Sequence, residues 1–186
     1  MTKGNYIRRQ SEKKKSKKQE LDFDFVYSKL MESKYFSIVQ TFNITGGEPF
    51  ICKGLKDFIL KLLPYVQIDL STNGWYIEEI TKLAEGIKES KPKNRLKICL
   101  SIDHIGAQHD LIRGIKGSYD KIEQVIAIIG KVPEIELQIN TVIQDDNIKD
   151  LEQIKSKLKK FNPTDHQFIP MLPLPNQNIS FTDEQI

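Results

Sequence analysis

Phe36-Ser-Ile-Val-Gln-Thr-Phe-Asn-Ile-Thr45 is the stretch that decides the fold class, and Gly46-Gly47 follows it directly. Its β-branched and aromatic residues are typical of a strand, and the glycine pair predicts a tight turn at its end. Apolar residues at helical spacing predict a helix before it, over residues 22–34, and another after it, over 55–63, where Pro64 ends the pattern. The stretch is therefore expected to be one strand in an alternating series of helices and strands.

The same alternation continues along the chain. Further helices are predicted at 77–88, 119–130 and 148–161, and further strands at 66–71, 96–102, 135–143 and 166–171. Successive strands begin about 30 to 40 residues apart, which is room for a strand plus a crossover helix. The fold class is therefore α/β with a parallel sheet, either an open doubly wound sheet or part of a barrel, since five strands do not close an eight-stranded barrel.

Length and composition limit the class of protein. A chain of 186 residues and 21.5 kDa, 39% hydrophobic and 28% charged, predicts one globular domain and excludes wholesale disorder. Without a long apolar stretch or the apolar core of a signal peptide, it is expected to have no membrane partner and to be cytoplasmic. Cys52 and Cys99 suggest neither a disulfide framework nor a zinc site, and both are interpreted as buried, reduced thiols.

Charge is unevenly distributed. Residues 1–20 hold eight basic and two acidic side chains, whereas the remainder holds 20 basic and 23 acidic ones. We expect residues 1–20 to form a mobile basic arm, since they contain few apolar residues to repay their ordering, and residues 172–186 to form an extended tail. Nucleic acid is an unlikely partner, because Tyr6 is the sole aromatic residue among these lysines.

Polar residues gather where the predicted strands end. They occupy residues 45–49, 71–74, 101–104 and 140–141. The carboxyl ends of parallel strands converge with the following loops and helix starts, so these side chains are expected to share one site. Ordinary turn chemistry is the alternative for each cluster taken alone.

Four of these segments carry a family resemblance. Ile44-Thr-Gly-Gly-Glu-Pro49, Leu70-Ser-Thr-Asn-Gly74, Leu100-Ser-Ile-Asp103, and His109-Asp-Leu-Ile-Arg-Gly114 followed by Gly117-Ser-Tyr-Asp120 together resemble the middle of a radical S-adenosylmethionine (SAM) enzyme. The resemblance covers residues 21–171. It implies a partial TIM-type (βα)6 barrel of parallel strands, with the first strand and the cluster loop missing from this sequence.

The resemblance also implies site residues. The cofactor-binding set is Gly46, Gly47, Glu48, Pro49, Ser101, Arg113 and Asn140, and the substrate-facing set is Ser71, Thr72, Asn73 and Asp103. The turn at 46–48 would hold the methionyl amino group of SAM. Ser101 would contact its carboxylate or ribose, Arg113 its carboxylate, and Asn140 its ribose. Structural alternatives remain open: Glu48-Pro49 could simply start a helix, Asn73-Gly74 could form a turn, and Arg113 could make a surface ion pair.

Two further histidines, His104 and His109, are expected to be orienting or surface residues rather than ligands, and His166 is expected to be structural. We assign neither a catalytic residue nor a metal ligand to the chain.

One feature of the family is absent. Its members bind a [4Fe-4S] cluster through Cys-x3-Cys-x2-Cys, and this sequence has only two cysteines, 47 positions apart. The chain alone would therefore not ligate the cluster, and its affinity for SAM should be weak. We expect a fragment or cluster-free relative of an enzyme that cleaves SAM to a 5′-deoxyadenosyl radical, in peptide modification or cofactor biosynthesis, with a small-molecule or peptide substrate.

The alternative function is a non-catalytic binding or scaffold protein that uses the barrel remnant and the basic arm. Whether the chain is an enzyme stays open at this point. Because residues 36–44 contain neither Pro nor a charged side chain, an unpartnered strand there would lack edge protection. Self-association through this edge is expected, unless the arm or the tail covers it.

Overall fold

The computed structural model describes residues 22–171, so the predicted arm and tail lie outside the described residues. The helices are α1 (Phe23–Glu32), α2 (Leu55–Leu62), α3 (Ile77–Ser90), α4 (Ala107–Arg113), α5 (Ser118–Ile129) and α6 (Leu151–Leu158). The strands are β1 (Thr41–Ile44), β2 (Gln67–Thr72), β3 (Leu96–Ser101), β4 (Ile135–Ile143) and β5 (Asp165–Pro170). Short 3-10 turns are η1 (Phe36–Ile38), η2 (Pro49–Ile51), η3 (Ile148–Asp150) and η4 (Lys159–Phe161).

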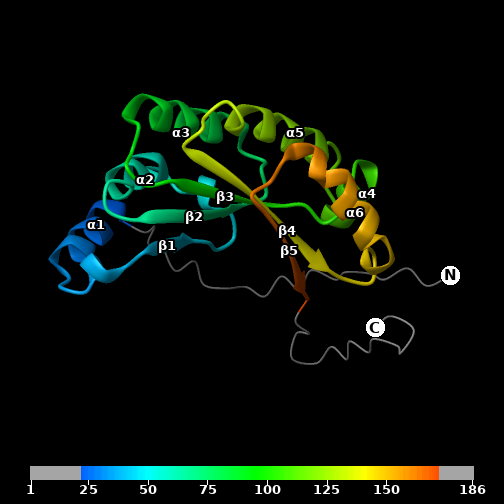
Figure 1. The fold of residues 1–186 in the computed structure, drawn as a ribbon, viewed down its shortest axis with the longest axis horizontal. Helices are drawn as coiled ribbons and strands as arrows, with labels where there is room; N and C mark the ends of the chain where they lie inside the picture. The colour runs from blue at the N-terminus through cyan, green and yellow to red at the C-terminus, as the bar shows by residue number, and fades with distance from the viewer. Residues whose placement is uncertain (1–21, 172–186) are drawn as a thin grey trace, which may run out of the picture.

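The five strands form one parallel sheet in chain order, β1-β2-β3-β4-β5. Crossovers of one hand that always add the next strand on the same side place every crossover helix on one face of the sheet. Figure 1 shows this arrangement, with α2, α3, α5 and α6 stacked along one face of a curved sheet. This winding is that of a partial TIM-type barrel rather than of a doubly wound sheet, and it confirms the predicted fold class.

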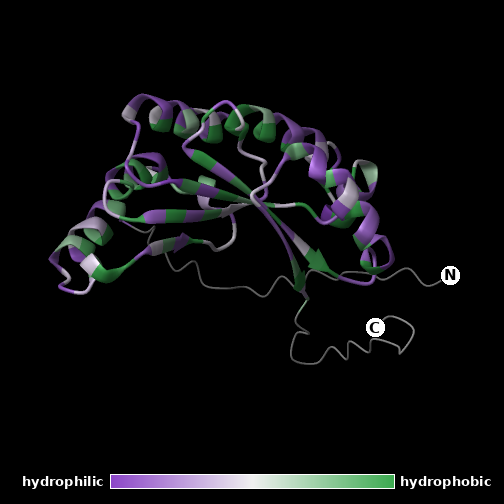
Figure 2. Ribbon diagram, viewed as in Figure 1, coloured by the Kyte–Doolittle hydropathy of each residue, from purple (hydrophilic) through white to green (hydrophobic). Residues whose placement is uncertain are grey.

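The core lies between the helices and the sheet. Alternate residues of β2 face it, so that Ile68, Leu70 and Thr72 are buried while their neighbours along the strand are partly exposed. The helices turn their apolar sides toward the sheet and their polar sides outward (Figure 2). Side chains such as Ile59 and Ile80 are fully buried there, and burying each stabilises the fold by roughly 1.5–3 kcal/mol.

The predicted strand at 36–45 was too long. Only Thr41–Ile44 pair with β2, and Phe36–Ile38 form η1 instead. Strand β2 begins at Gln67, opposite Thr41, and the Gln67 N–H donates to Gln40 O (3.2 Å), so the pairing starts at this point rather than at Phe36. The Phe36 ring packs instead against Tyr65, with ring centroids 6.4 Å apart.

Two other expectations change. The sequence patterns did not predict α4, a seven-residue helix whose apolar residues are too few to set a period. Cys99 is buried as expected, but Cys52 is exposed, because it follows η2 on the loop that leads to the left-handed Gly54. No helix between residues 22 and 171 has the length and apolarity that a membrane crossing requires.

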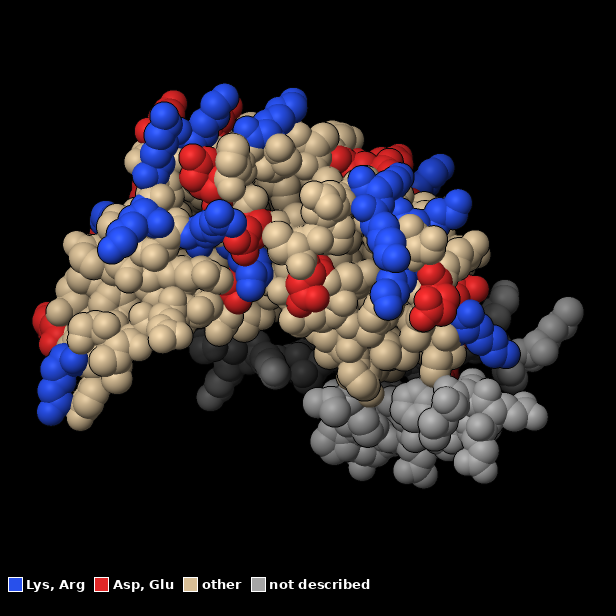
Figure 3. All heavy atoms as spheres, in the orientation of Figure 1, with Lys and Arg blue, Asp and Glu red and all other residues tan. Residues whose placement is uncertain are grey.

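Strand β1 is an edge strand that pairs only with β2 among the described strands. Beside it, Tyr35, Ile38 and Val39 are exposed hydrophobic residues, with Ile38 76% exposed. Figure 3 shows a broad neutral area at this end of the molecule, whereas basic and acidic side chains intermingle over the helices. An apolar, uncharged edge of this kind favours association.

We expect the chain to self-associate at micromolar concentration and Ile38→Lys to raise its monomer fraction, because association through this edge would bury the new lysine charge. Size-exclusion chromatography with light scattering measures this. Leu111→Lys, at an exposed leucine of α4 away from the edge, is the matched control. A wild-type chain that stays monomeric would contradict the expectation.

Candidate functional site

The loops that follow β1 and β2 are joined by the carboxylate of Glu48. Its Oε1 accepts a hydrogen bond from Thr72 Oγ1 (2.8 Å), and its Oε2 accepts one from the backbone N–H of Asn73 (2.9 Å). Glu48 also caps η2 by accepting from Phe50 N–H (3.3 Å), with Pro49 as the first residue of that turn. The interpretation of Glu48-Pro49 as a helix start therefore holds, and the buried Glu48 side chain fixes the path of the preceding turn.

That preceding turn, Gly46-Gly47, is exposed. Gly46 has a φ of +143°, which favours glycine, and a Cβ at either position would project into open space with nothing within 4 Å. Their backbone N–H and C=O groups form no hydrogen bond with another described residue. The turn thus presents free main-chain donors and acceptors at the carboxyl edge of the sheet.

The loop after β2 is a tight turn. Asn73 Oδ1 accepts from Trp75 N–H (2.9 Å), as in an Asx turn. Gly74 has a φ of +75°, and a Cβ there would lie 3.3 Å from Ile122 Cγ1, so any other residue would be strained at this position. The turn interpretation of Asn73-Gly74 is confirmed, and Thr72 lies buried beneath it with its hydroxyl donated to Glu48.

Ser71, Ser101 and Asn140 lie on the face of the sheet opposite the buried Thr72, Leu100 and Ile139, and all three are partly exposed. The β3–β4 register sets Ser101 directly beside Asn140. Asn140 Oδ1 accepts from Gln138 Nε2 at 2.8 Å, which leaves the Asn140 amide N–H groups free of partners among the described residues. The structure therefore brings Ser101 and Asn140 together at the open face.

Arg113 is the last residue of α4, and its side chain lies against Asp103, which follows the end of β3. Arg113 Nε lies 2.8 Å from Asp103 Oδ2, although its N–H is not aligned to donate a hydrogen bond to it. Asp103 is 4% exposed, and its Oδ1 accepts from the backbone N–H of Val142 (3.0 Å) on β4. Arg113 therefore pairs with a buried carboxylate and is not the surface ion pair considered as its alternative.

His109 and Asp110 of α4 are also engaged. His109 is buried, and its Nδ1 accepts from Asp103 N–H (3.2 Å). Burial and the nearby Arg113 charge lower the pKa of His109 to about 4, so the ring is neutral at pH 7. Asp110 accepts hydrogen bonds from Gly117 N–H, Ser118 Oγ and Tyr119 N–H, which lower the pKa of its carboxyl group and fix the start of α5.

Sequence reasoning missed residues that support Asp103. Asn147 is 1% exposed and donates from Nδ2 to the carbonyl oxygens of Asp103 (2.9 Å) and Val142 (2.8 Å). The Thr141 hydroxyl donates to Ile102 O (2.6 Å). Asn147 follows two aspartates in a loop, where an Asn indicates only a turn, so the sequence held no signal for this role.

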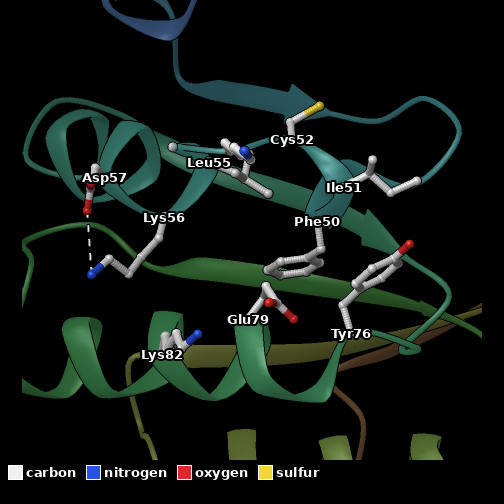
Figure 4. Close-up of a pocket in the computed structure, with 11 residues that line it drawn as sticks. Phe50, Ile51, Cys52, Leu55, Lys56, Asp57, Tyr76, Glu79 and Lys82 are labelled. Atoms are coloured by element: carbon white, nitrogen blue, oxygen red, sulfur yellow. Dashed lines mark ion pairs between the residues drawn. The ribbon is translucent and has the colours of Figure 1, made fainter. Parts of the chain in front are cut away.

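Two cavities flank the site. A small one of about 170 Å³ brings together residues from the β2 loop and from α4 and α5. It is lined by Asn73, Trp75, His109, Arg113, Ile115 and Ser118. A larger one of about 500 Å³ lies between the starts of α2 and α3, and Figure 4 shows Phe50, Tyr76 and Glu79 converging there. None of the sequence-predicted site residues lines the larger cavity.

The cysteines do not form a cluster site. Burial and the nearby Asp69 charge raise the pKa of Cys99 to about 11, so its thiol stays protonated at neutral pH. Cys52 is exposed on the loop after η2. Among residues 22–171, no group of three or more His, Cys, Asp or Glu side chains could hold a metal ion. The residues present therefore do not fit a [4Fe-4S] cluster.

No family model matches the chain, but curated relatives do. It is 32% identical over 124 residues to a GTP 3',8-cyclase of Helicobacter pylori, a match that covers 61% of this chain and 35% of the relative. It is 31% identical over 145 residues to a GTP 3',8-cyclase of Clostridium perfringens, covering 73% and 41%. A probable GTP 3',8-cyclase of Archaeoglobus fulgidus is 29% identical over 153 residues, covering 78% and 49%. The chain spans between a third and a half of the length of these relatives.

Solved structures agree on the fold. Native anSMEcpe with bound AdoMet superposes with a TM-score of 0.64 at 21% identity, over 86% of this chain and 44% of the other. The same protein with AdoMet and the Cp18Cys peptide gives a TM-score of 0.65 at 20% identity, over 86% and 45%. The chain thus has the fold of part of these AdoMet-bound proteins. GTP 3',8-cyclase is a radical SAM enzyme, and the chain is a relative of the radical SAM superfamily, as its motifs indicated.

Replacing Glu48 should destabilise the fold. In Glu48→Gln, the side-chain NH2 would meet the donors Thr72 Oγ1–H or Asn73 N–H, leaving one of them unpaired. We expect the free energy of unfolding to fall by about 1–3 kcal/mol. Urea denaturation measures it, with the exposed Glu89→Gln as control, which should change stability by less than about 0.5 kcal/mol. Equal effects of the two substitutions would contradict the role of Glu48.

His109 should make stability depend on pH. Between its folded pKa of about 4 and its unfolded value of 6.5, the unfolded chain binds the additional proton, so stability falls as pH decreases through this window. From pH 7 to pH 5 the contribution is about 1–2 kcal/mol. In His109→Asn, which retains an acceptor for Asp103 N–H, the denaturant midpoint should depend less on pH. A variant as steep as the wild type would refute this.

Proposed function

We propose that the carboxyl edge of the sheet binds SAM, and that the chain supplies the SAM-positioning part of a radical SAM active site. The observation that carries the proposal is Arg113, a guanidinium held against a buried aspartate, with its side chain 30% exposed. It shares this edge with the free main-chain groups of Gly46-Gly47 and with the Ser101–Asn140 pair.

The hydrogen-bond donors and acceptors at this edge suit the different groups of SAM. An α-amino group needs acceptors, which the free carbonyl groups of Gly46 and Gly47 can provide. A carboxylate suits the forked donors of Arg113 together with the Ser101 hydroxyl, and ribose hydroxyl groups suit the Asn140 amide. Thr72 and Glu48 would act indirectly, because their polar atoms bond to each other.

In the family, SAM bound at a [4Fe-4S] cluster supplies a 5′-deoxyadenosyl radical for hydrogen abstraction. The residues of this chain do not fit that cluster. The chain's own contribution would be to bind the methionyl and ribose groups and to orient them over the open face of the sheet.

The substrate is proposed to be a small molecule or a peptide, in cofactor biosynthesis or peptide modification. The name of the curated relatives, GTP 3',8-cyclase, and the peptide bound to anSMEcpe support the two possibilities. Substrate would lie on the open face, near Ser71 and Asn73, where polar side chains carry no helix cover from the described chain.

A second candidate is a binding protein without catalytic activity, and the two distant cysteines favour it. Anaerobic reconstitution with iron and sulfide, followed by assay for 5′-deoxyadenosine from SAM, separates the two when the chain is tested alone. Product formation would refute the binding-only function.

The test of SAM binding uses saturation-transfer NMR with SAM and with decarboxylated SAM, which keeps the amino group and the nucleoside. The wild-type chain should bind SAM about tenfold more tightly, because only SAM offers a carboxylate to Arg113. In Arg113→Gln this preference should disappear.

Arg95→Gln is the matched control. Arg95 is exposed, lies just before β3 at the opposite edge of the sheet, and pairs with Glu136 at 2.7 Å. It should leave the preference for SAM unchanged. Equal binding of the two ligands by the wild-type chain would overturn the proposed function.

A further inference from the structure

Asp103 lies at the junction of three elements. It follows β3, its carboxylate binds the backbone of β4, and it faces Arg113 at the end of α4. Its backbone is held as well, since its N–H donates to His109 Nδ1 and its carbonyl accepts from Asn147 Nδ2. Two side-chain and two backbone contacts thus fix this residue, which is 4% exposed.

A residue so enclosed has little surface with which to bind a substrate. Oδ1 is occupied by Val142 N–H, and Oδ2 lies against Arg113 Nε. Arg113 itself has room to move, because the small cavity of about 170 Å³ lies beside it and Gly114 follows it in a left-handed conformation. Fixing a long arginine side chain in one conformation costs rotamer entropy. An ion pair with a nearby carboxylate offsets this cost.

We infer that Asp103 is a positioning residue that sets the direction of the Arg113 guanidinium. With Nε against Asp103, the two terminal nitrogens of Arg113 remain to make a two-point contact with a carboxylate. Val142 lies two residues after Asn140 on β4, so the same strand fixes both the arginine and the amide proposed for ribose. The inference rests on the proposed function, and it assigns Asp103 to Arg113 rather than to the substrate.

The test compares Asp103→Asn with Asp110→Asn. Asp103→Asn keeps an oxygen for Val142 N–H but removes the charge that faces Arg113. The affinity ratio of SAM to decarboxylated SAM should fall from about tenfold to less than about threefold. Asp110→Asn weakens the start of α5 without facing Arg113, so it should lower stability and leave the ratio unchanged.

A second measurement does not depend on SAM. In a ¹⁵N-arginine spectrum, the Nε–H signal of Arg113, assigned with Arg113→Gln, should exchange slowly with water in the wild type, because Nε is buried against Asp103. It should exchange at least about tenfold faster in Asp103→Asn. If that variant does not fold, Asp103→Ser serves instead, since it also offers an oxygen near Val142 N–H and lacks the charge.

The outcomes are distinct. An unchanged ligand ratio in Asp103→Asn, with a wild type that prefers SAM, overturns the inference and leaves the proposed function standing. A wild type without preference overturns the proposed function, and an unchanged Nε–H exchange rate overturns the pairing itself. Loss of the ratio together with faster exchange supports the inference.

Discussion

The handedness of the crossovers is the constraint on which the rest of the structure depends. Each helix must return the chain on the same side, so five strands in sequential order place all crossover helices on one face. The core then forms on that side alone. The opposite face carries polar side chains, and the carboxyl ends of the strands bring their loops to one rim.

Three carboxylates hold the loops and helix ends of this rim in place. Glu48 joins the first two loops, Asp110 fixes the start of α5, and Asp103 joins β3, β4 and α4. Each accepts from backbone N–H groups that the loops would otherwise leave unpaired, and such charge-assisted hydrogen bonds are stronger than neutral ones. The polar motifs of the sequence therefore hold the loops of this rim in place, in addition to presenting polar groups on it.

Much of the fold could be predicted from sequence because its signals are local. Strand β4 was predicted with the bounds it has, and α2, α3 and α5 to within two residues, since apolar period and breakers such as Pro64 decide them. The strand before Gly46 was overestimated, because its length depends on where its partner begins. Helix α4 was missed, because its stability comes from His109 and Asp110 reaching other segments.

Part of the candidate site could likewise be predicted from the sequence, and part could not. Motif spacing placed Ser101 and Asn140 at the ends of successive strands, which the register sets side by side, and turn chemistry described Asn73-Gly74. What the sequence could not reveal was which carboxylate meets which partner: Asp103 depends on Val142, 39 residues away, and on Asn147, 44 residues away. Such pairs form only once the sheet register exists, and no local pattern encodes them.

The free main-chain groups of Gly46-Gly47 have a consequence for how such a rim can evolve. Their placement depends on the path of the backbone and not on the chemistry of neighbouring side chains. Glu48 fixes that path through its hydrogen bonds to the β2 loop. Surrounding residues can therefore drift toward new substrates while the pattern of donors and acceptors in the turn persists. Only a change that redirects the backbone, at a glycine or at its carboxylate anchor, would erase that pattern.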